Sequence, residues 1–167
     1  MNRRHALSML AAVPAAVALP ALPARALHWT DIPARLGATP GLSTLNSALE
    51  ASGLMAGLRV KTASYTLFAP TNEAFAALPA GTLDDLLRPE NQSALENVLR
   101  GHLVLGRLRS DQFLGRRVQI TMANGSRIRV DGTRSPAVVN NRARLLGMDD
   151  EGRNGIIHVI DAVILPG

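Results

Sequence analysis

The strongest structural signals in this chain are two segments, Thr66-Leu-Phe-Ala-Pro-Thr-Asn-Glu-Ala-Phe75 and Asn154-Gly-Ile-Ile-His-Val-Ile-Asp-Ala-Val-Ile-Leu-Pro166. The second contains a near-continuous β-branched run over residues 156–165, which is typical of a strand covered on both faces. The first predicts a short strand, Tyr65–Phe68, that ends at Ala69-Pro70 because proline has no N–H to give to a sheet.

A helix is predicted directly after the first strand. Thr71 stands where an N-cap hydroxyl accepts a hydrogen bond from the free amides of the first turn. Glu73 lies in that turn, where its charge is favourable against the helix dipole. Phe75 belongs to the stripe that this helix buries.

Further helices are expected in the first half of the chain. Ser43 or Thr44 is the predicted cap of a helix beginning near residue 42, and Thr82-Leu-Asp-Asp85 resembles a capping box. The apolar positions at helical spacing are Leu42, Leu45 and Leu49, then Leu83, Leu86 and Leu87, then Leu95, Val98 and Leu99.

The period changes to two in the second half of the chain. Val118, Ile120 and Met122 alternate with polar residues, and Asn124-Gly125 predicts a two-residue hairpin turn. Ile128 and Val130 then face inward on the returning strand, and 138–139 and 143–145 are weaker strand candidates. Helices that precede a group of strands predict an α+β fold without βαβ repetition.

The composition fits one domain plus a short extra segment. The chain has 167 residues, 47% of them hydrophobic but only 3% aromatic, so the core must consist of aliphatic side chains. It has no cysteine, which excludes disulfides, thiolate metal sites and a cysteine nucleophile.

Residues 1–26 have the pattern of a secretory signal peptide. A basic start is followed by an apolar centre and by the small–x–small end Ala24-Arg25-Ala26. Arg3-Arg4 is compatible with twin-arginine export as well as with the general route. The expected organisation is a signal peptide at 1–26, a lead-in segment at 27–40 and a single domain at 41–167, with no stable membrane anchor after processing.

The expected net charge of the processed chain does not indicate nucleic-acid binding. Loss of Arg3, Arg4 and Arg25 lowers the formal net charge from +5 to +2. Several arginines nevertheless occur as close pairs, which are Arg107/Arg109, Arg116/Arg117, Arg127/Arg129 and Arg142/Arg144. They form either a binding surface for acidic polysaccharide or phospholipid headgroups, or a solvated face balanced by acids elsewhere.

The residues that carry chemistry predict neither a metal site nor a catalytic site. There is no paired histidine spacing, and no Gly-x-Ser-x-Gly elbow. His158 and Asp161 lie three apart on one strand, so they point to opposite faces. Both are expected to be buried polar groups with hydrogen-bond partners. Asp149-Asp-Glu151 is predicted to be an acidic loop without calcium-loop spacing.

The two quoted segments, in this order, resemble the signature segments of the fasciclin domain. Residues 82–91 are similar to the helical insert of that family, and Gly101-His-Leu-Val-Leu-Gly-Arg-Leu108 stands where the family carries Tyr-His followed by apolar residues. The resemblance covers residues 35–166. It implies a wedge-like fold, with β-sandwich-like sheets and helices packed alongside. Thr71, Asn72, Phe75, His158 and Asp161 would be its structural motif residues.

The resemblance also implies a secreted, periplasmic or cell-surface protein without enzyme activity or cofactor, acting in adhesion or extracellular-matrix contacts. The partner would be a surface protein or a polysaccharide. Integrin is disfavoured because Gly101 replaces the family's tyrosine and Asp149-Asp150 replaces its Asp-Ile. The alternative is a carrier of a small apolar ligand, carotenoid-like or lipid-like, within the same fold.

We expect any partner surface to involve the segment around His102, namely His102, Leu103, Val104, Arg107 and Arg109. The segment lies between a helix and the strand-rich half, and its arginines would form a polar rim around an apolar patch. The alternative is that Leu103 and Leu105 belong to the core.

Processing is predicted between Ala26 and Leu27. N-terminal sequencing of the exported protein should begin at Leu27, because the small residues at 24 and 26 suit a signal peptidase. An exported form that still carries residues 1–26 would contradict both the site and the soluble periplasmic assignment.

Overall fold

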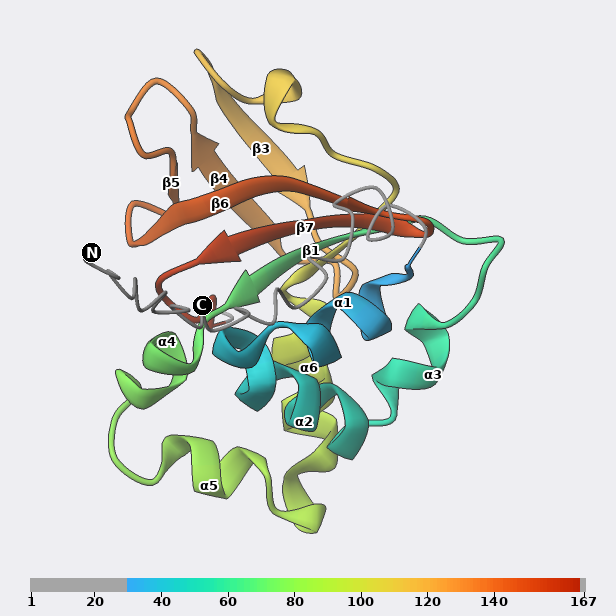
Figure 1. Ribbon diagram of the computed structural model, residues 1–167. Helices are drawn as coiled ribbons and strands as arrows, with labels where there is room; N and C mark the ends of the chain where they lie inside the picture. Colours follow the sequence, from blue (N-terminus) through green and yellow to red (C-terminus); the bar gives the residue numbers. More distant parts are fainter. Residues whose placement is uncertain (1–29, 166–167) are drawn as a thin grey trace, which may run out of the picture.

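The computed structural model describes residues 30–165, so the expected signal peptide lies outside the described residues. Its centre is a mixed seven-stranded sheet of order β2-β1-β7-β6-β5-β4-β3 (Figure 1). Only β1 and β7 pair in parallel, with Leu67 opposite Ile157. The strands are β1 Tyr65–Pro70, β2 Leu103–Leu105, β3 Arg117–Thr121, β4 Arg127–Asp131, β5 Val138–Val139, β6 Ala143–Gly152 and β7 Gly155–Ile160.

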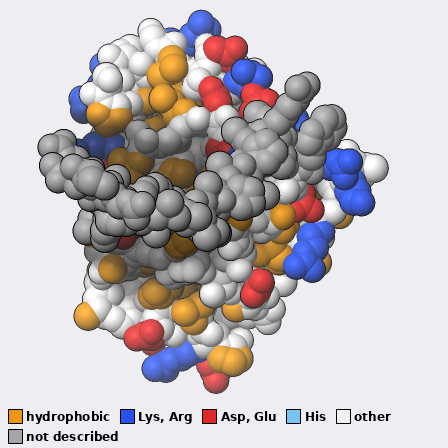
Figure 2. All heavy atoms as spheres, in the orientation of Figure 1, with side chains coloured by type: hydrophobic (Ala, Val, Ile, Leu, Met, Phe, Trp, Pro, Cys, Tyr) orange, Lys and Arg blue, Asp and Glu red, His pale blue; other side chains and the backbone are white. Residues whose placement is uncertain are grey.

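Short helices form a layer that lies below β1 and β7 in Figure 1. The α-helices are α1 Ile32–Ala38, α2 Ser43–Ala51, α3 Leu54–Leu58, α4 Asn72–Ala76, α5 Thr82–Leu86 and α6 Gln92–Arg100, and the 3-10 turns are η2 Pro40–Leu42, η3 Pro89–Asn91 and η4 Ser110–Gln112. None of the helices in the described part of the chain is long and apolar enough to cross a membrane. Acidic and basic side chains are interspersed on the face that Figure 2 shows.

Strand alternation divides the interior into two cores. Leu67 and Ala69 of β1 face the helices, while Phe68 between them faces the opposite side. There it packs with Ile128, Val139 and other residues of β3 to β6. The sheet therefore bends over its own second core, and the Ala123 amide after β3 donates to Leu103 O of β2 at 2.7 Å. The predicted α+β fold is confirmed, and one continuous sheet produces the sandwich-like halves.

Several local expectations are also confirmed. Asn124-Gly125 lies in the turn between β3 and β4, with Ile128 and Val130 inward and Arg127 and Arg129 exposed. The expected two-residue turn is instead a three-residue loop, since the Met122 amide donates to Ser126 O and only Gly125, of Asn124 and Gly125, has a positive φ. β7 is buried along almost its whole length.

Three local expectations need correction. The lead-in segment contains α1, whose Ile32 and Leu36 are fully buried. β1 continues through Pro70. Residues 149–151 are not a loop but the end of β6, where the pairing with β7 shifts register. The alternation of apolar and polar residues is weak in this stretch, because a bulge changes which side chains of the strand face inward.

Helix starts differ most from the sequence prediction. Thr82 makes no cap hydrogen bond, because Gly81 with φ of 82° occupies the N-cap of α5. Neither Ser43 nor Thr44 caps α2 through its own side chain. Instead, Asn72 reaches across from α4, accepts from the Thr44 amide at 3.0 Å and donates to Pro40 O. The free amide of Thr44 in the first turn of α2 is thus satisfied by a side chain 28 residues away in the sequence.

Thr71 caps α4 as predicted, since its Oγ1 accepts from the Ala74 amide at 3.2 Å. Thr71→Ala should therefore lower the free energy of unfolding by about 0.5–2 kcal/mol. Thr82→Ala is the matched control, because Thr82 opens a helix without capping it, and its effect should stay within about 0.5 kcal/mol. Urea denaturation checks both changes, and equal midpoints for the two variants would contradict the capping role.

Candidate functional site

The segment predicted to contact a partner is largely interior. His102 is 1% exposed, and Leu103 and Val104 are also buried. The alternative that Leu103 belongs to the core is therefore confirmed, whereas Leu105 is exposed. The reason is that β2 lies between the two cores: Leu103 faces the helices and Val104 faces the bent sheet. Arg107 and Arg109 do reach the surface, and their part in partner binding remains a prediction.

His102 joins three parts of the backbone. Its Nδ1–H donates to Val98 O of α6 at 2.8 Å, and its Nε2 accepts from the Ile164 amide beyond β7 at 2.9 Å. Burial lowers the pKa of His102 to about 4, against the opposing effect of the Val98 carbonyl. The ring is therefore neutral, and both nitrogens are already used.

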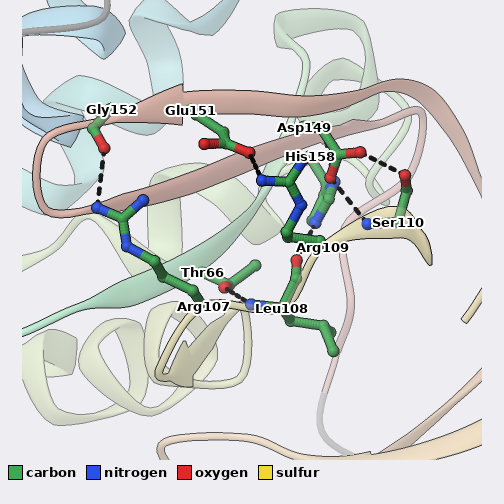
Figure 3. Close-up of polar contacts among 9 residues, drawn as sticks. All are labelled: Thr66, Arg107, Leu108, Arg109, Ser110, Asp149, Glu151, Gly152 and His158. Atoms are coloured by element: carbon green, nitrogen blue, oxygen red, sulfur yellow. Dashed lines mark hydrogen bonds and ion pairs between the residues drawn. The ribbon is translucent and has the colours of Figure 1, made fainter. Parts of the chain in front are cut away.

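Hydrogen bonds and an ion pair hold the segment after β2 against β1 and the β6–β7 hairpin (Figure 3). Thr66 Oγ1 donates to Gly106 O and accepts from the Leu108 amide, both at 2.8 Å. The Arg107 guanidinium donates to the carbonyls of Gly152 and Arg153, at 3.1 and 2.6 Å. Arg109 pairs with Glu151 at 2.5 Å. Both arginines thus stabilise this segment as well as bordering the surface.

A serine, an aspartate and a histidine meet beside this segment (Figure 3), but they do not form a catalytic triad. The Ser110 hydroxyl donates to Asp149 rather than to His158. His158 Nδ1 accepts from the Asp149 amide at 3.2 Å, and Nε2 donates to Leu108 O at 2.8 Å. With both ring nitrogens bonded to the backbone, His158 has no free base position for the serine.

The pKa values of this cluster agree with a structural role. Burial works against ionisation of Asp149, but the hydrogen bonds from Ser110 together with the nearby His158 and Arg109 outweigh it and hold the pKa of that carboxyl below its usual value. Burial lowers the pKa of His158 despite its contacts with Leu108 and Asp149. The cluster fixes η4 and the bulge of β6 to β7.

The expectation for His158 and Asp161 is confirmed in part. His158 is fully buried between the rings of Phe68 and Phe113, with hydrogen-bond partners. Asp161 is only partly buried; it accepts from the Arg144 amide and pairs with the Arg144 guanidinium at 3.3 Å. The two side chains do not meet. Within residues 30–165 no cluster of three or more histidine and acidic side chains could hold a metal ion.

A surface hollow with mainly apolar walls lies at the open edge of the sheet, between α3 and β2. Its volume is about 320 Å³. Its walls are Leu54, Gly57, Leu58, Tyr65, Arg100, Leu103, Leu105 and Ala123. Leu105 is 72% exposed at its border, more than any other large hydrophobic side chain among the described residues. We name this hollow and its border the Leu105 pocket.

Sequence analysis did not identify the Leu105 pocket, although the alternation from Leu103 to Leu105 shows that both leucines share one face of β2. Leu103 is nevertheless buried, whereas Leu105 at the end of β2 is exposed. Gly101 lies near this region, and a Cβ there would stand 3.1 Å from Asn124 Nδ2. Asn124 therefore crowds the position where the family carries tyrosine.

This chain belongs to the fasciclin domain family, whose model matches residues 40–166. It is similar to Protein sll1483 of Synechocystis sp., with 42% identity over 125 residues that cover 74% of this chain and 67% of that protein. It is 41% identical to the pig transforming growth factor-beta-induced protein ig-h3 over 101 residues, which are 60% of this chain but only 15% of that protein.

A solved structure shares the fold. It is a FAS1 domain pair from the insect cell adhesion molecule fasciclin I, with a TM-score of 0.74 and 21% identity. The match covers 83% of this chain and 51% of that one.

The buried His102 makes stability depend on pH. The unfolded chain binds a proton near pH 6.5, whereas the folded chain resists protonation until about pH 4. Stability should therefore fall as the pH drops from about 6.5 to about 4, by about 2 kcal/mol between pH 7 and pH 5. Between pH 7 and pH 5 the free energy of unfolding of His102→Gln should fall by about 2 kcal/mol less than that of the unchanged protein, whatever the stability of the variant at pH 7. Urea titrations at several pH values check this, and an unchanged pH dependence would exclude His102 as its source.

Proposed function

We propose that this chain is an exported, non-enzymatic interaction module that docks a surface protein at the Leu105 pocket. The observation that carries the proposal is the 72% exposure of Leu105 beside a hollow lined mainly by apolar side chains. Burying one leucine side chain stabilises a complex by about 1.5–3 kcal/mol. A partner that covers Leu105 recovers this free energy.

The surroundings of the pocket suit a protein partner. Arg100 lines it among apolar residues, so the apolar hollow has a charged side chain in its wall, and a polar rim around an apolar centre is the usual arrangement of a protein interface. An inserted side chain of the partner would supply the central contact. The fasciclin I domain pair comes from a cell adhesion molecule, and membership of the same family supports an adhesive role here.

The absence of enzyme activity is proposed on the geometry of the histidines. Both nitrogens of His102 and of His158 bond to backbone groups. Neither ring can exchange a proton with a substrate without breaking those bonds.

The second candidate is a carrier of an apolar ligand in the same pocket. A volume of about 320 Å³ is at the lower end of ligand pockets, which span roughly 300–1,000 Å³. It suits a short acyl chain better than a long polyene. Organic extraction of the protein from its native source separates the two, because a carrier yields a stoichiometric lipid or pigment and a docking module yields neither.

Leu105→Asp should weaken binding of the labelled domain to the surface of cells that produce it by at least about tenfold, because a charge replaces the apolar contact. Leu146→Asp is the matched control, since Leu146 is a strand leucine that is 60% exposed on β6. It should bind as the unchanged domain does. Equal binding by all three proteins, or an equal loss in both variants, would refute docking at this pocket.

A further inference from the structure

Charge is strongly segregated along this fold. Residues 116–144, which form β3, β4, β5 and the start of β6, contain seven arginines and a single acidic residue, Asp131. The remaining described residues contain eight basic and twelve acidic side chains. The small net charge of the domain therefore hides a basic part at the end of the sheet that lies away from the helical layer (Figure 1).

Strand register places two of these arginines, Arg127 and Arg129, on one face. Gln119 is opposite Arg129 and Thr121 is opposite Arg127 in the antiparallel β3–β4 pair. These four side chains are exposed, whereas Ile120 and its inward neighbours belong to the second core. Side chains two apart on a strand are roughly 6.5–7 Å apart, so Arg127 and Arg129 present two guanidinium groups side by side. We name the outward side of β3 and β4 the arginine face.

The acids near this face are already engaged. Arg117 and Arg134 both pair with Asp131, at 3.1 and 3.5 Å, and Asp161 pairs with Arg144. Within residues 30–165 no acidic side chain lies within ion-pair distance of Arg127 or Arg129. The sequence-based alternative of a face balanced by acids thus fails for these two side chains.

The chemistry of the arginine face selects one kind of partner. Guanidinium groups bind carboxylate in bidentate geometry, and the amide of Gln119 and the hydroxyl of Thr121 suit sugar hydroxyls. No aromatic residue occurs between 114 and 144, so nucleic-acid bases have no stacking platform there. Large exposed apolar side chains, which help a protein enter a membrane surface, are also lacking on β3 and β4.

We propose that the arginine face, with Arg127 and Arg129 at its centre, binds a linear acidic polysaccharide that carries carboxylate groups. Open strands without a hollow suit an extended polymer, whose repeated charges contact several arginines at once. Neither Arg127 nor Arg129 lines the Leu105 pocket, and the inference does not depend on protein docking there.

Alginate, a polymer of uronic acids, is a suitable probe, and neutral dextran is the comparison polymer. In affinity electrophoresis at low salt the domain should be retarded by alginate but not by dextran. Arg127→Gln with Arg129→Gln should reduce alginate affinity at least about tenfold. The matched control is Arg59→Gln with Lys61→Gln, which removes the same charge from two exposed residues two positions apart, and it should change affinity less than about twofold.

Both variants alter exposed side chains, so circular dichroism and urea midpoints should stay unchanged. Leu105→Asp should bind alginate normally, which keeps this test independent of the docking test. Equal affinity for alginate in both double variants overturns the proposal, as does an equal loss in both. Vesicles of anionic lipid that displace alginate at equal charge would overturn it in favour of headgroup binding.

Discussion

The side chain of Asn154 connects the helical layer to the centre of the sheet at the point where the chain enters β7. Its Oδ1 accepts from the Ile32 amide at the start of α1 at 2.9 Å, and its Nδ2 donates to Leu58 O at the end of α3. Its own carbonyl accepts from the Tyr65 amide at the start of β1. Because the residue is buried, loss of the side chain would leave two backbone groups without partners in a site that excludes water. The next residue must be glycine, since a Cβ at 155 would collide with Tyr65 O and Ile32 Cδ1.

The polar residues of the interior follow the same principle. His102, His158 and Thr66 bond to backbone groups of distant segments, as Asn154 does. Parallel β1 and β7 are covered on both faces, so every loop that crosses them needs an internal partner for its amides and carbonyls. The side chains most suited to catalysis are therefore occupied in closing the fold.

Two surfaces of the fold differ in character. The Leu105 pocket is apolar and lies where the helical layer ends beside β2, whereas the arginine face lies on β3 and β4 at the opposite edge of the sheet. They approach each other where the sheet bends, because Ala123, which lines the pocket, follows Thr121 of the arginine face by two residues.

The sequence by itself determined the elements whose signals are local. Asn124-Gly125 set the hairpin, Thr71 set the start of α4, and the β-branched run set a strand buried on both faces, because turn, cap and periodicity depend on neighbouring residues. Only the tertiary structure decided the rest. Asn72 caps a helix that is distant in sequence, a bulge turns an apparent acidic loop into strand β6, and the end of the helical layer leaves Leu105 exposed while Leu103 is buried. These outcomes depend on which segments meet in space, and spacing along the chain does not encode that.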